Sequence, residues 1–317
     1  DEAEQPSRLM GVPPAPGAAA WDETLWLTAC DGVRLRAALW HGGGRGLALL
    51  LPGRTEFLEK AAIPAAALVA RGFSVAALAW RGQGRSDRLA APPAKGHVAD
   101  FRDYGRDLAA LVTAPEVVDA GPPALVVAHS MGGAIALEAL AEGSLPRVPL
   151  VLSAPMLAIA MNPVLRAATA ALLAGARLLG RCEGWPPFGR PSVPYHRAAA
   201  FEGNMLTGDG AVYAWLSDAS GADARLGLGM PSLAWIARAE EAMTRIGRMG
   251  PLPVPALCLV GSAERVVDRS AVHAGCARLG AECVEIDGGR HELLIEAAPV
   301  RAAAWAAIDA FIARQGL

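Results

Sequence analysis

The chain has 317 residues, 53% of them hydrophobic and 19% charged, with a mean hydropathy of +0.30. This composition fits one large folded domain, with or without an insertion, and excludes an intrinsically disordered chain. The net charge of −2 provides no basic surface, so we expect no nucleic-acid partner.

Residues 1–20 begin with acidic residues, continue with Pro, Gly and Ala, and lack the basic start and apolar centre of a signal peptide. We therefore expect a flexible N-terminal arm over 1–20. We also expect a cytoplasmic protein, either free or peripheral to the inner membrane, because the apolar helical stretch at 162–180 is interrupted by Arg166 and Arg177 and falls short of a membrane span.

Strand and helix patterns alternate along most of the chain. The predicted elements are two strands within 24–40 around Asp31-Gly32, a strand at 47–51, a helix at 57–71, a strand at 73–80, a helix at 100–113, a strand at 124–129, a helix at 133–142 and a strand at 148–154. The alternation returns with a strand at 255–261, a helix near 269–279, a strand at 282–288 and a helix at 299–314.

This alternation predicts an α/β fold whose mostly parallel central sheet carries helices on both faces. No clear strand occurs between 155 and 250. We therefore predict a core formed by 21–154 and 251–317, with an inserted helical cap at 155–250. Ligands of such sheets lie at the carboxyl ends of the strands, so functional residues should directly follow the apolar runs.

One such position is Ser130. The segment Ala128-His129-Ser130-Met131-Gly132 joins a predicted strand to a predicted helix and approximates the G-x-S-x-G nucleophile elbow. Alanine occupies the first glycine position and is small enough for the sharp turn. The segment alone is also compatible with an ordinary turn of small residues.

A serine nucleophile needs a histidine base and an acid that orients it. The six histidines are His41, His97, His129, His196, His273 and His291. His291 follows the strand at 282–288 through a short loop and lies at the correct sheet edge. We expect the side chain of His129 to point away from Ser130, because neighbouring strand residues face opposite sides.

The acid should lie between the serine and the histidine in the chain. Glu264 is the first carboxylate after the strand at 255–261, and Asp268 follows four residues later. We favour Glu264, because an Asp at a helix start more often caps the helix, but both could reach the same sheet edge.

An oxyanion hole needs two backbone N–H donors. We assign them to Met131, which follows the serine, and to Arg54, which follows Gly53 in the loop after the strand at 47–51. The simpler interpretation of Pro52-Gly53 is a turn.

Several segments together resemble the bacterial lysophospholipase L2 and monoacylglycerol lipase branch of the α/β-hydrolase superfamily. They are LLPGRTEFLEK (50–60), WRGQGRSDR (80–88), GHVADF (96–101), AHSMGGA (128–134), GSAERVVD (261–268) and GGRHELLIE (288–296). The resemblance implies a serine hydrolase without metal or cofactor, with a Ser130, His291 and Glu264 triad and with oxyanion donors at Arg54 and Met131.

Three positions depart from the family pattern. Ala128 replaces the usual glycine, Glu264 stands where many relatives have aspartate, and Pro52-Gly53 stands where lipases often have His-Gly. None of these changes removes a chemical group that the reaction requires, although the last could alter the substrate pocket.

We predict hydrolysis of carboxylic esters through an acyl-enzyme, with medium or long monoacyl lipids such as lysophospholipids or monoglycerides as substrates. An apolar cap suits an acyl chain, and peripheral membrane contact through the cap is a further expectation; the oligomeric state is not predicted. The aromatic cap residues considered are Trp185, Phe188, Trp215 and Trp235.

Two other functions stay open. A peptidase or amidase of the same superfamily, similar to proline iminopeptidases, would use acidic cap residues to hold a substrate amine; the candidates are Glu202, Asp209, Asp218 and Asp223. The third reading is a non-catalytic ligand-binding protein. Haloalkane dehalogenases and epoxide hydrolases are disfavoured, since those relatives have aspartate at the position of Ser130.

Overall fold

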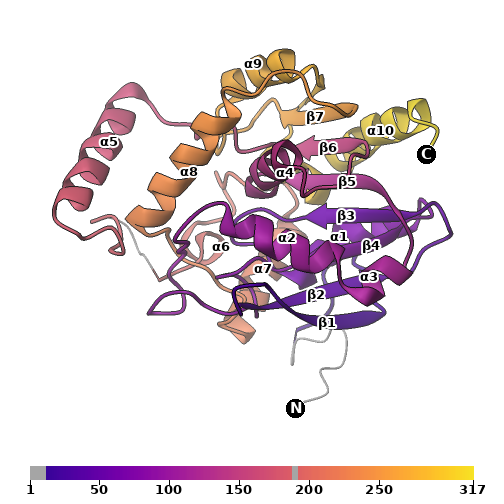
Figure 1. Ribbon diagram of the computed structural model, residues 1–317, viewed down its shortest axis with the longest axis horizontal. Coiled ribbons are helices and arrows are strands. Elements are labelled where there is room, and N and C mark those ends of the chain that lie inside the picture. Colours follow the sequence, from indigo (N-terminus) through magenta and orange to yellow (C-terminus); the bar gives the residue numbers. More distant parts are fainter. Residues whose placement is uncertain (1–11, 188–191) are drawn as a thin grey trace.

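The computed structural model describes residues 12–187 and 192–317 (Figure 1). Within them, eight strands form one sheet in the order β1-β2-β4-β3-β5-β6-β7-β8. The strands are β1 (Glu23–Thr28), β2 (Arg34–Trp40), β3 (Leu47–Leu51), β4 (Ser74–Leu78), β5 (Pro123–His129), β6 (Leu150–Ser153), β7 (Ala256–Gly261) and β8 (Glu282–Ile286). Strand β2 runs antiparallel to β1 and β4, and every other pair is parallel.

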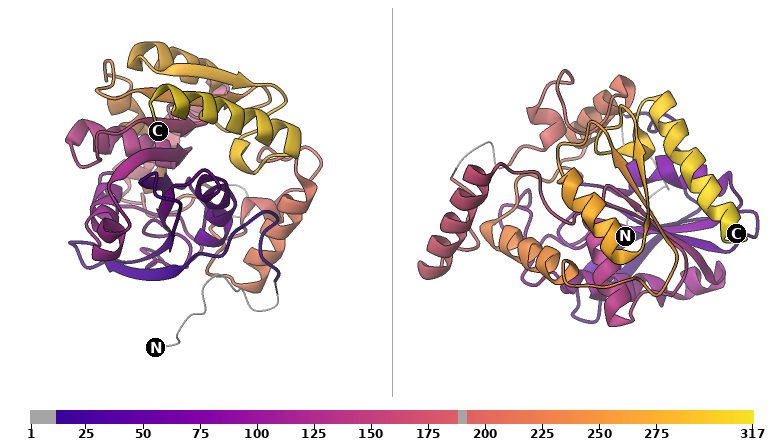
Figure 2. Two further views of the ribbon diagram at one scale, coloured as in Figure 1. Left: turned by 90° about the vertical axis from the view of Figure 1, so that its right-hand side faces the viewer. Right: turned by 90° about the horizontal axis from the view of Figure 1, so that it is seen from above.

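Helices cover both faces of this sheet, as predicted (Figures 1 and 2). Helices α1 (Leu58–Val69) and α10 (Ala298–Arg314) pack on one face; α2 (Asp103–Val112), α3 (Pro115–Asp119), α4 (Met131–Glu142), α8 (Leu233–Ile246) and α9 (Arg269–Leu279) pack on the other. Strand β3 shows why two layers are needed. Leu49 and Leu51 face one helix layer while Ala48 and Leu50 face the other, so an all-apolar strand is buried on both sides.

The described part of the segment between β6 and β7, which we predicted to form the cap, contains helices and no strand of the sheet. It contains α5 (Pro163–Leu178), α6 (Tyr195–Ala198), α7 (Gly210–Ala222) and α8. Asn162, Asp209 and Ser232 accept backbone N–H bonds at the starts of α5, α7 and α8, which fixes where these helices begin. Phe188 lies outside the described residues.

Helix α5 projects from the body of the molecule beside α8 (Figures 1 and 2). Leu173 and Ala176 pack against Leu233 and Ala237 of α8, and most of the remaining α5 surface is open. Among the described helices, none combines the length and hydropathy needed to cross a bilayer.

Residues 12–20 correct our expectation of a flexible arm in this part of the chain. The Trp215 indole donates a hydrogen bond to the Pro13 carbonyl (2.8 Å), and Ala15 is buried in the same apolar cluster as Trp215. The Trp40 indole likewise donates to the Ala19 carbonyl (3.2 Å). Indole donors and apolar contacts therefore hold this proline-rich segment on the fold; residues 1–11 lie outside the described range.

Candidate active site

Ser130 occupies a sharp turn between β5 and α4. Its φ of 50° and ψ of −115° are rare for a residue with a side chain and cost roughly 1–3 kcal/mol. The turn is held from both sides, because the Ser130 N–H donates to the Ser153 carbonyl (3.0 Å) and the Ser130 carbonyl accepts from the Met156 N–H (2.9 Å). The surrounding backbone thus supports a strained serine at the carboxyl end of β5.

Small residues beside Ser130 are required by close backbone packing. A Cβ atom on Gly132 would lie 2.3 Å from the Leu51 carbonyl oxygen, so no larger residue fits. Ala128 is completely buried between its register partners Leu51 and Leu152. The departure to alanine at this position is therefore accommodated within the sheet.

Two hydrogen bonds join Ser130, His291 and Glu264. The Ser130 Oγ lies 3.0 Å from His291 Nε2, and His291 Nδ1 lies 2.7 Å from Glu264 Oε2. With the proton on Nδ1, the imidazole donates to Glu264 and accepts from the serine hydroxyl. Burial raises the pKa of Glu264, but the bonds from His291 and from the N–H groups of the following loop outweigh it and lower the pKa overall. Glu264 is thus held ionised beside the imidazole.

Asp268, the alternative acid, has a different position. It is the N-cap of α9, where its Oδ1 accepts from the Ala271 N–H (3.1 Å) and from the Ser270 hydroxyl (2.6 Å). Glu264 therefore contacts the His291 imidazole, whereas Asp268 caps the start of α9.

The other five histidines have partners away from the serine hydroxyl. They are His41 with Glu23, His97 with Ser232, His196 with Ser220, His273 with Glu285, and His129 with Glu56. All six lie within the described residues, and of these only His291 contacts Ser130 Oγ. Geometry alone thus selects one histidine of six.

The backbone N–H groups of Arg54 and Met131 donate to no acceptor within the described residues. Met131 is the first residue of α4, where N–H groups lack intrahelical partners. The loop that carries Arg54 is fixed by Gln83, whose side chain accepts from the Thr55 N–H (2.7 Å) and donates to the Gly53 carbonyl (3.2 Å). The Arg54 N–H is therefore free in an otherwise well-bonded loop, and the Met131 N–H is free at the start of α4.

A cavity of about 410 Å³ opens beside Ser130 and His291. This volume falls in the range of small-molecule sites. Its wall is mainly apolar and includes Trp235 and the methionines Met156, Met161, Met205, Met230 and Met243. Of the cap aromatics named from the sequence, Trp235 lines the cavity, whereas Trp215 of α7 is buried in an apolar cluster with Phe57 and Ile63.

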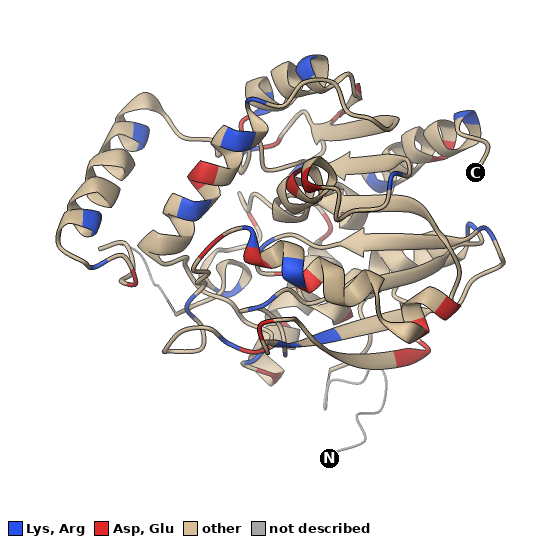
Figure 3. Cartoon of the chain, viewed as in Figure 1, with Lys and Arg blue, Asp and Glu red and all other residues tan. Residues whose placement is uncertain are grey.

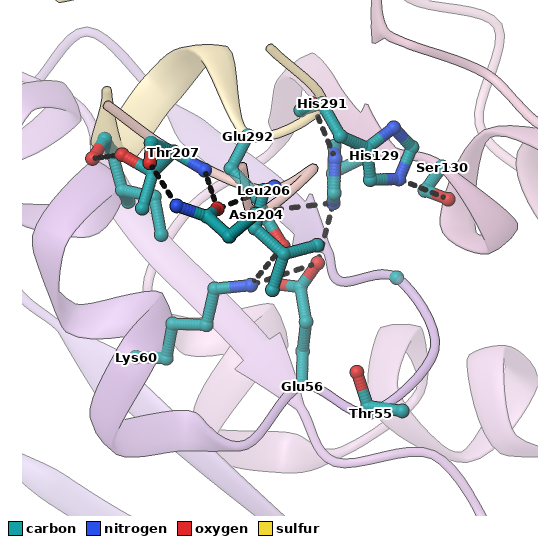
Figure 4. Close-up of polar contacts among 12 residues, drawn as sticks. Thr55, Glu56, Lys60, His129, Ser130, Asn204, Leu206, Thr207, His291 and Glu292 are labelled. Atoms are coloured by element: carbon teal, nitrogen blue, oxygen red, sulfur yellow. Dashed lines mark hydrogen bonds and ion pairs between the residues drawn. The ribbon is translucent and has the colours of Figure 1, made fainter. Parts of the chain in front are cut away.

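A buried ionic cluster lies beside the loop that carries His291 (Figure 4). We use this name for Glu56, Lys60, His129 and Glu292, which are all buried. His129 Nδ1 is bonded to the Glu56 carboxylate, and Lys60 Nζ lies 2.5 Å from Glu292 Oε1 and 3.5 Å from Glu56 Oε1. His129 Nε2 lies 3.1 Å from the backbone oxygen of His291. The cluster thereby fastens α1 and β5 to the loop that carries His291.

The cluster balances two cations against two carboxylates. Burial lowers the pKa of His129, but Glu292 and Glu56 outweigh it and raise it to about 9. Burial raises the pKa of Glu56, but Lys60 and His129 outweigh it and lower it to about 2. The pKa of Lys60 is raised by the same two carboxylates against the effect of burial. His129 is thus held as a cation with both ring nitrogens occupied, which removes it as a base.

Glu56, His129 and Glu292 are also the one set of three His, Cys, Asp or Glu residues within the described residues whose ligand atoms all lie within 4.8 Å of one another. The Lys60 ammonium already provides positive charge at this place. We therefore assign no metal to it.

The sequence analysis did not select Glu56, Lys60 or Glu292 as individual residues. The sequence offered one indication of this cluster: the α1 sequence LEKAAIPAAALV has charged residues in its first turn and only apolar residues after it. Charged residues at the start of such a helix must be either exposed or paired, and here they are paired.

The comparisons with known proteins agree with this fold. The family described as serine aminopeptidase, S33, matches residues 43–298. Lysophospholipase L2 of Escherichia coli (strain K12) is 32% identical over 281 residues, which is 84% of this chain and 80% of that protein. The probable lysophospholipase L2 of Haemophilus influenzae is 29% identical over 259 residues, which is 81% of this chain and 80% of that protein.

Two solved structures are similar at low sequence identity. A soluble variant of the Saccharomyces cerevisiae monoglyceride lipase has a TM-score of 0.66 and 17% identity, covering 92% of this chain and 96% of that one. The Paleococcus ferrophilus monoacylglycerol lipase has a TM-score of 0.65 and 18% identity, covering 88% and 98%. The predicted α/β-hydrolase fold and the resemblance to lysophospholipase L2 are confirmed, and the chain belongs to the serine aminopeptidase family S33.

Proposed function

We propose that the protein is a serine hydrolase that cleaves carboxylic esters of monoacyl lipids, such as lysophospholipids or monoglycerides. One observation carries the proposal: the hydrogen-bonded series Ser130, His291 and Glu264 borders an apolar cavity. Similarity to proteins named lysophospholipase L2 supports the same substrate class.

In the first half-reaction, His291 Nε2 takes the Ser130 proton while Oγ attacks the ester carbonyl. Glu264 keeps the imidazole oriented and stabilises its cation. The N–H groups of Arg54 and Met131 bind the negative oxygen that develops, and loss of one such donor costs roughly 3 kcal/mol in comparable sites. His291 then protonates the leaving alcohol, which leaves an acyl group on Ser130.

In the second half-reaction, water replaces the alcohol. His291 takes a proton from water, the resulting hydroxide attacks the acyl-serine, and the proton returns to Ser130 as the fatty acid leaves. All proton transfers pass through one imidazole, so no metal or cofactor is needed by this mechanism.

The cavity wall favours an acyl chain over a polar substrate group. The methionine side chains are flexible and polarisable, which suits chains that vary in length or unsaturation. We expect activity to increase from acetyl esters to medium and long acyl esters.

A peptidase function would need a carboxylate aimed at a substrate amine. Among the described lining residues, none of the four acidic cap candidates is present. Asp223 pairs with Arg85 and Arg225, and Asp209 caps α7; Glu202 and Asp218 are exposed. The four candidates therefore give no support to the aminopeptidase reading, from which the family takes its description, and the cap carboxylate that such a reading would have to use is Glu240 of α8, which lines the cavity.

The test is a hydrolysis panel of lysophospholipids, monoglycerides, short esters and aminoacyl amides, with Ser130→Ala as the control. We expect the highest kcat/KM on a monoacyl lipid and no turnover above background in Ser130→Ala. An optimum on acetyl esters or on an aminoacyl amide would overturn the proposed substrate class.

We further propose that α5 contacts a membrane surface. Val164, Leu178 and Leu179 are 79%, 88% and 69% exposed, and Leu165 is 45% exposed while also lining the cavity. Residues 161–182 contain arginines but no acidic residue, and Figure 3 shows only basic colour on α5. Exposed apolar side chains with basic neighbours suit anionic lipid headgroups.

Flotation with phosphatidylglycerol vesicles tests this contact. Glu substitutions at Val164, Leu178 and Leu179 together should abolish flotation while kcat/KM on a monomeric short ester stays within about twofold. A Val118→Glu variant is the matched control, because Val118 is 58% exposed on α3. Equal flotation of the α5 variant and the control would refute the contact.

A further inference from the structure

Three free thiols meet at the edge of the sheet opposite β1. Cys258 on β7 and Cys283 on β8 are direct register partners in neighbouring parallel strands. Cys276 of α9 lies in the same core layer as Cys258, and Cys283 packs against that layer. Three different elements therefore bring their thiols to one place, which the sequence spacing did not indicate.

Cys283 also belongs to a hydrogen-bonded series of its own. Its Sγ lies 3.4 Å from His273 Nδ1, and His273 Nε2 lies 2.9 Å from Glu285 Oε2. Glu285 is held in turn by Arg269 Nη2, 3.2 Å away. A cysteine, a histidine and a carboxylate are thus arranged in the order that activates a thiol, away from Ser130.

The electrostatic environment favours the reactive form of Cys283. The hydrogen bond with the neighbouring Cys258 thiol has the largest effect on the pKa of Cys283 and lowers it. Burial opposes this effect, but Cys276 and His273 add to it, so the pKa falls to about 6. The hydrogen bond that His273 donates to Glu285 raises the pKa of His273. The pKa of Cys258 is instead raised well above its usual range by Cys276 and Cys283. One thiol of the group is therefore a thiolate at neutral pH while Cys258 keeps its proton.

Accessibility divides the group in the same way. Cys283 is half-buried and lies beside the exposed side chains of His273 and Glu285, whereas Cys258 and Cys276 are buried. Neighbouring parallel strands lie roughly 4.8 Å apart, and disulfides span Cα separations of about 4.4–6.8 Å. A solvent-reachable thiolate is thus backed by the buried Cys258 thiol at a Cα separation that a disulfide can span, and Cys276 of α9 belongs to the same core layer.

We propose that Cys283 is a redox modification site that a peroxide oxidises and that Cys258 or Cys276 resolves to an intramolecular disulfide. The Cys283 thiolate attacks one peroxide oxygen, so an S–O bond forms, the O–O bond breaks, and hydroxide or an alkoxide leaves. The buried thiol then attacks the sulfenic sulfur, so an S–S bond forms, the S–O bond breaks, and water leaves with the thiol proton.

A zinc site is the competing use of three cysteines and a histidine. In the described part of the chain, no set of three potential metal ligands that includes a cysteine has all its ligand atoms within 4.8 Å of one another, as Glu56, His129 and Glu292 do. The geometry therefore favours thiol chemistry over a metal.

Alkylation kinetics of the wild-type protein give the first test. Iodoacetamide labelling is followed by peptide mapping at pH 6.0 and 8.5, with the exposed Cys30 as the internal control. We expect the ratio of the Cys283 rate to the Cys30 rate to be at least about tenfold higher at pH 6.0 than at pH 8.5, because the lowered pKa of Cys283 keeps a large part of this thiol ionised at pH 6.0. His273→Gln should remove most of this difference. A ratio independent of pH would overturn the proposal.

Peroxide treatment gives the second test. Equimolar hydrogen peroxide followed by non-reducing peptide mapping should yield a Cys283 disulfide with Cys258 or Cys276, reversed by dithiothreitol. Dimedone should trap a sulfenic acid at Cys283 in a Cys258→Ala, Cys276→Ala variant, with retained esterase activity showing that it is folded. Cys30→Ser should behave as the wild type. Oxidation of Cys30 with Cys283 left reduced, or equimolar zinc binding that Cys283→Ser abolishes, would overturn the proposal.

Discussion

Two sites built from the same residue types lie next to each other at the loop that carries His291. On one side, His291 shares hydrogen bonds with Ser130 and with the single carboxylate of Glu264. On the other, His129 lies among the carboxylates of Glu56 and Glu292. The centroids of the two imidazole rings are only 4.7 Å apart. The two rings therefore occupy the same region of the molecule, and location alone does not distinguish their roles.

Their surroundings give the two rings different chemistry. His291 has one carboxylate at Nδ1, and its Nε2 remains for the serine proton. His129 has both nitrogens committed, one to Glu56 and one to the His291 carbonyl, and two carboxylates hold it as a cation. A general base needs a nitrogen that can gain and lose a proton, as His291 Nε2 can. A buried imidazolium between carboxylates, such as His129, instead stabilises the packing of the segments that it joins. The four predictions below test this contrast.

The largest effect is expected for Ser130→Ala. Removal of the nucleophile in a comparable triad lowers kcat by roughly 10⁶-fold. We expect a loss of this order in kcat on a monoacyl ester, with an unchanged unfolding midpoint. A residual rate within about tenfold of the wild type would place the nucleophile elsewhere.

Glu264→Gln should lower kcat by roughly 10³–10⁴-fold, because an amide can favour the wrong tautomer of His291. Asp268→Asn is the matched control, since Asp268 caps α9. That variant should keep kcat within about threefold, because asparagine is also a good N-cap. Steady-state kinetics of both variants check this, and the reverse ranking would make Asp268 the triad acid.

Lys60→Met should destabilise the fold by about 3–5 kcal/mol, because it leaves buried carboxylates without their cation. The only other lysine in the chain provides the control. Lys95→Met should change the unfolding free energy by less than about 1 kcal/mol, since Lys95 lies at the surface, where it contacts the Glu183 carbonyl and the Trp185 ring. Urea unfolding measures both, and similar values would mean that the ionic cluster contributes little.

His129 should make stability depend on pH in a defined window. Its folded pKa of about 9 lies above the ordinary value of 6.5. Its contribution is therefore complete below pH 6.5 and is lost as pH rises through 9. Urea unfolding should show that the stability difference between wild type and His129→Gln shrinks by up to about 3 kcal/mol over this range. A constant difference would argue against a buried imidazolium.

Much of the fold follows from local patterns. Strands β3, β5 and β7 are short, largely buried apolar runs, and the proposed site residues Arg54, Ser130 and Glu264 follow shortly after their carboxyl ends, as His291 follows β8. Ser130, Glu264 and His291 could therefore be selected from one sequence, because parallel strands bring their carboxyl ends to one edge. Helix α4 begins at Met131 rather than at the predicted 133, since the turn at Ser130 leads directly into it.

The ionic cluster could not be predicted in the same way. Burial of Glu56 and Lys60 depends on contacts with Glu292, more than 230 residues away in the chain, and a sequence pattern normally places such charges on the surface. The packing of residues 12–20 depends likewise on the distant Trp215 indole. The apolar run around Cys258 is compatible with the burial of this residue, but its pairing with Cys283 depends on the strand register.

Mapping the site of a fluorophosphonate probe tests the central claim most directly. The probe should label Ser130 in the wild type and in His129→Gln, and labelling should fall at least about a thousandfold in rate in His291→Ala. Peptide mapping identifies the modified residue. Labelling of a different residue, or labelling that depends on His129 and not on His291, would contradict the assignment of the two histidines.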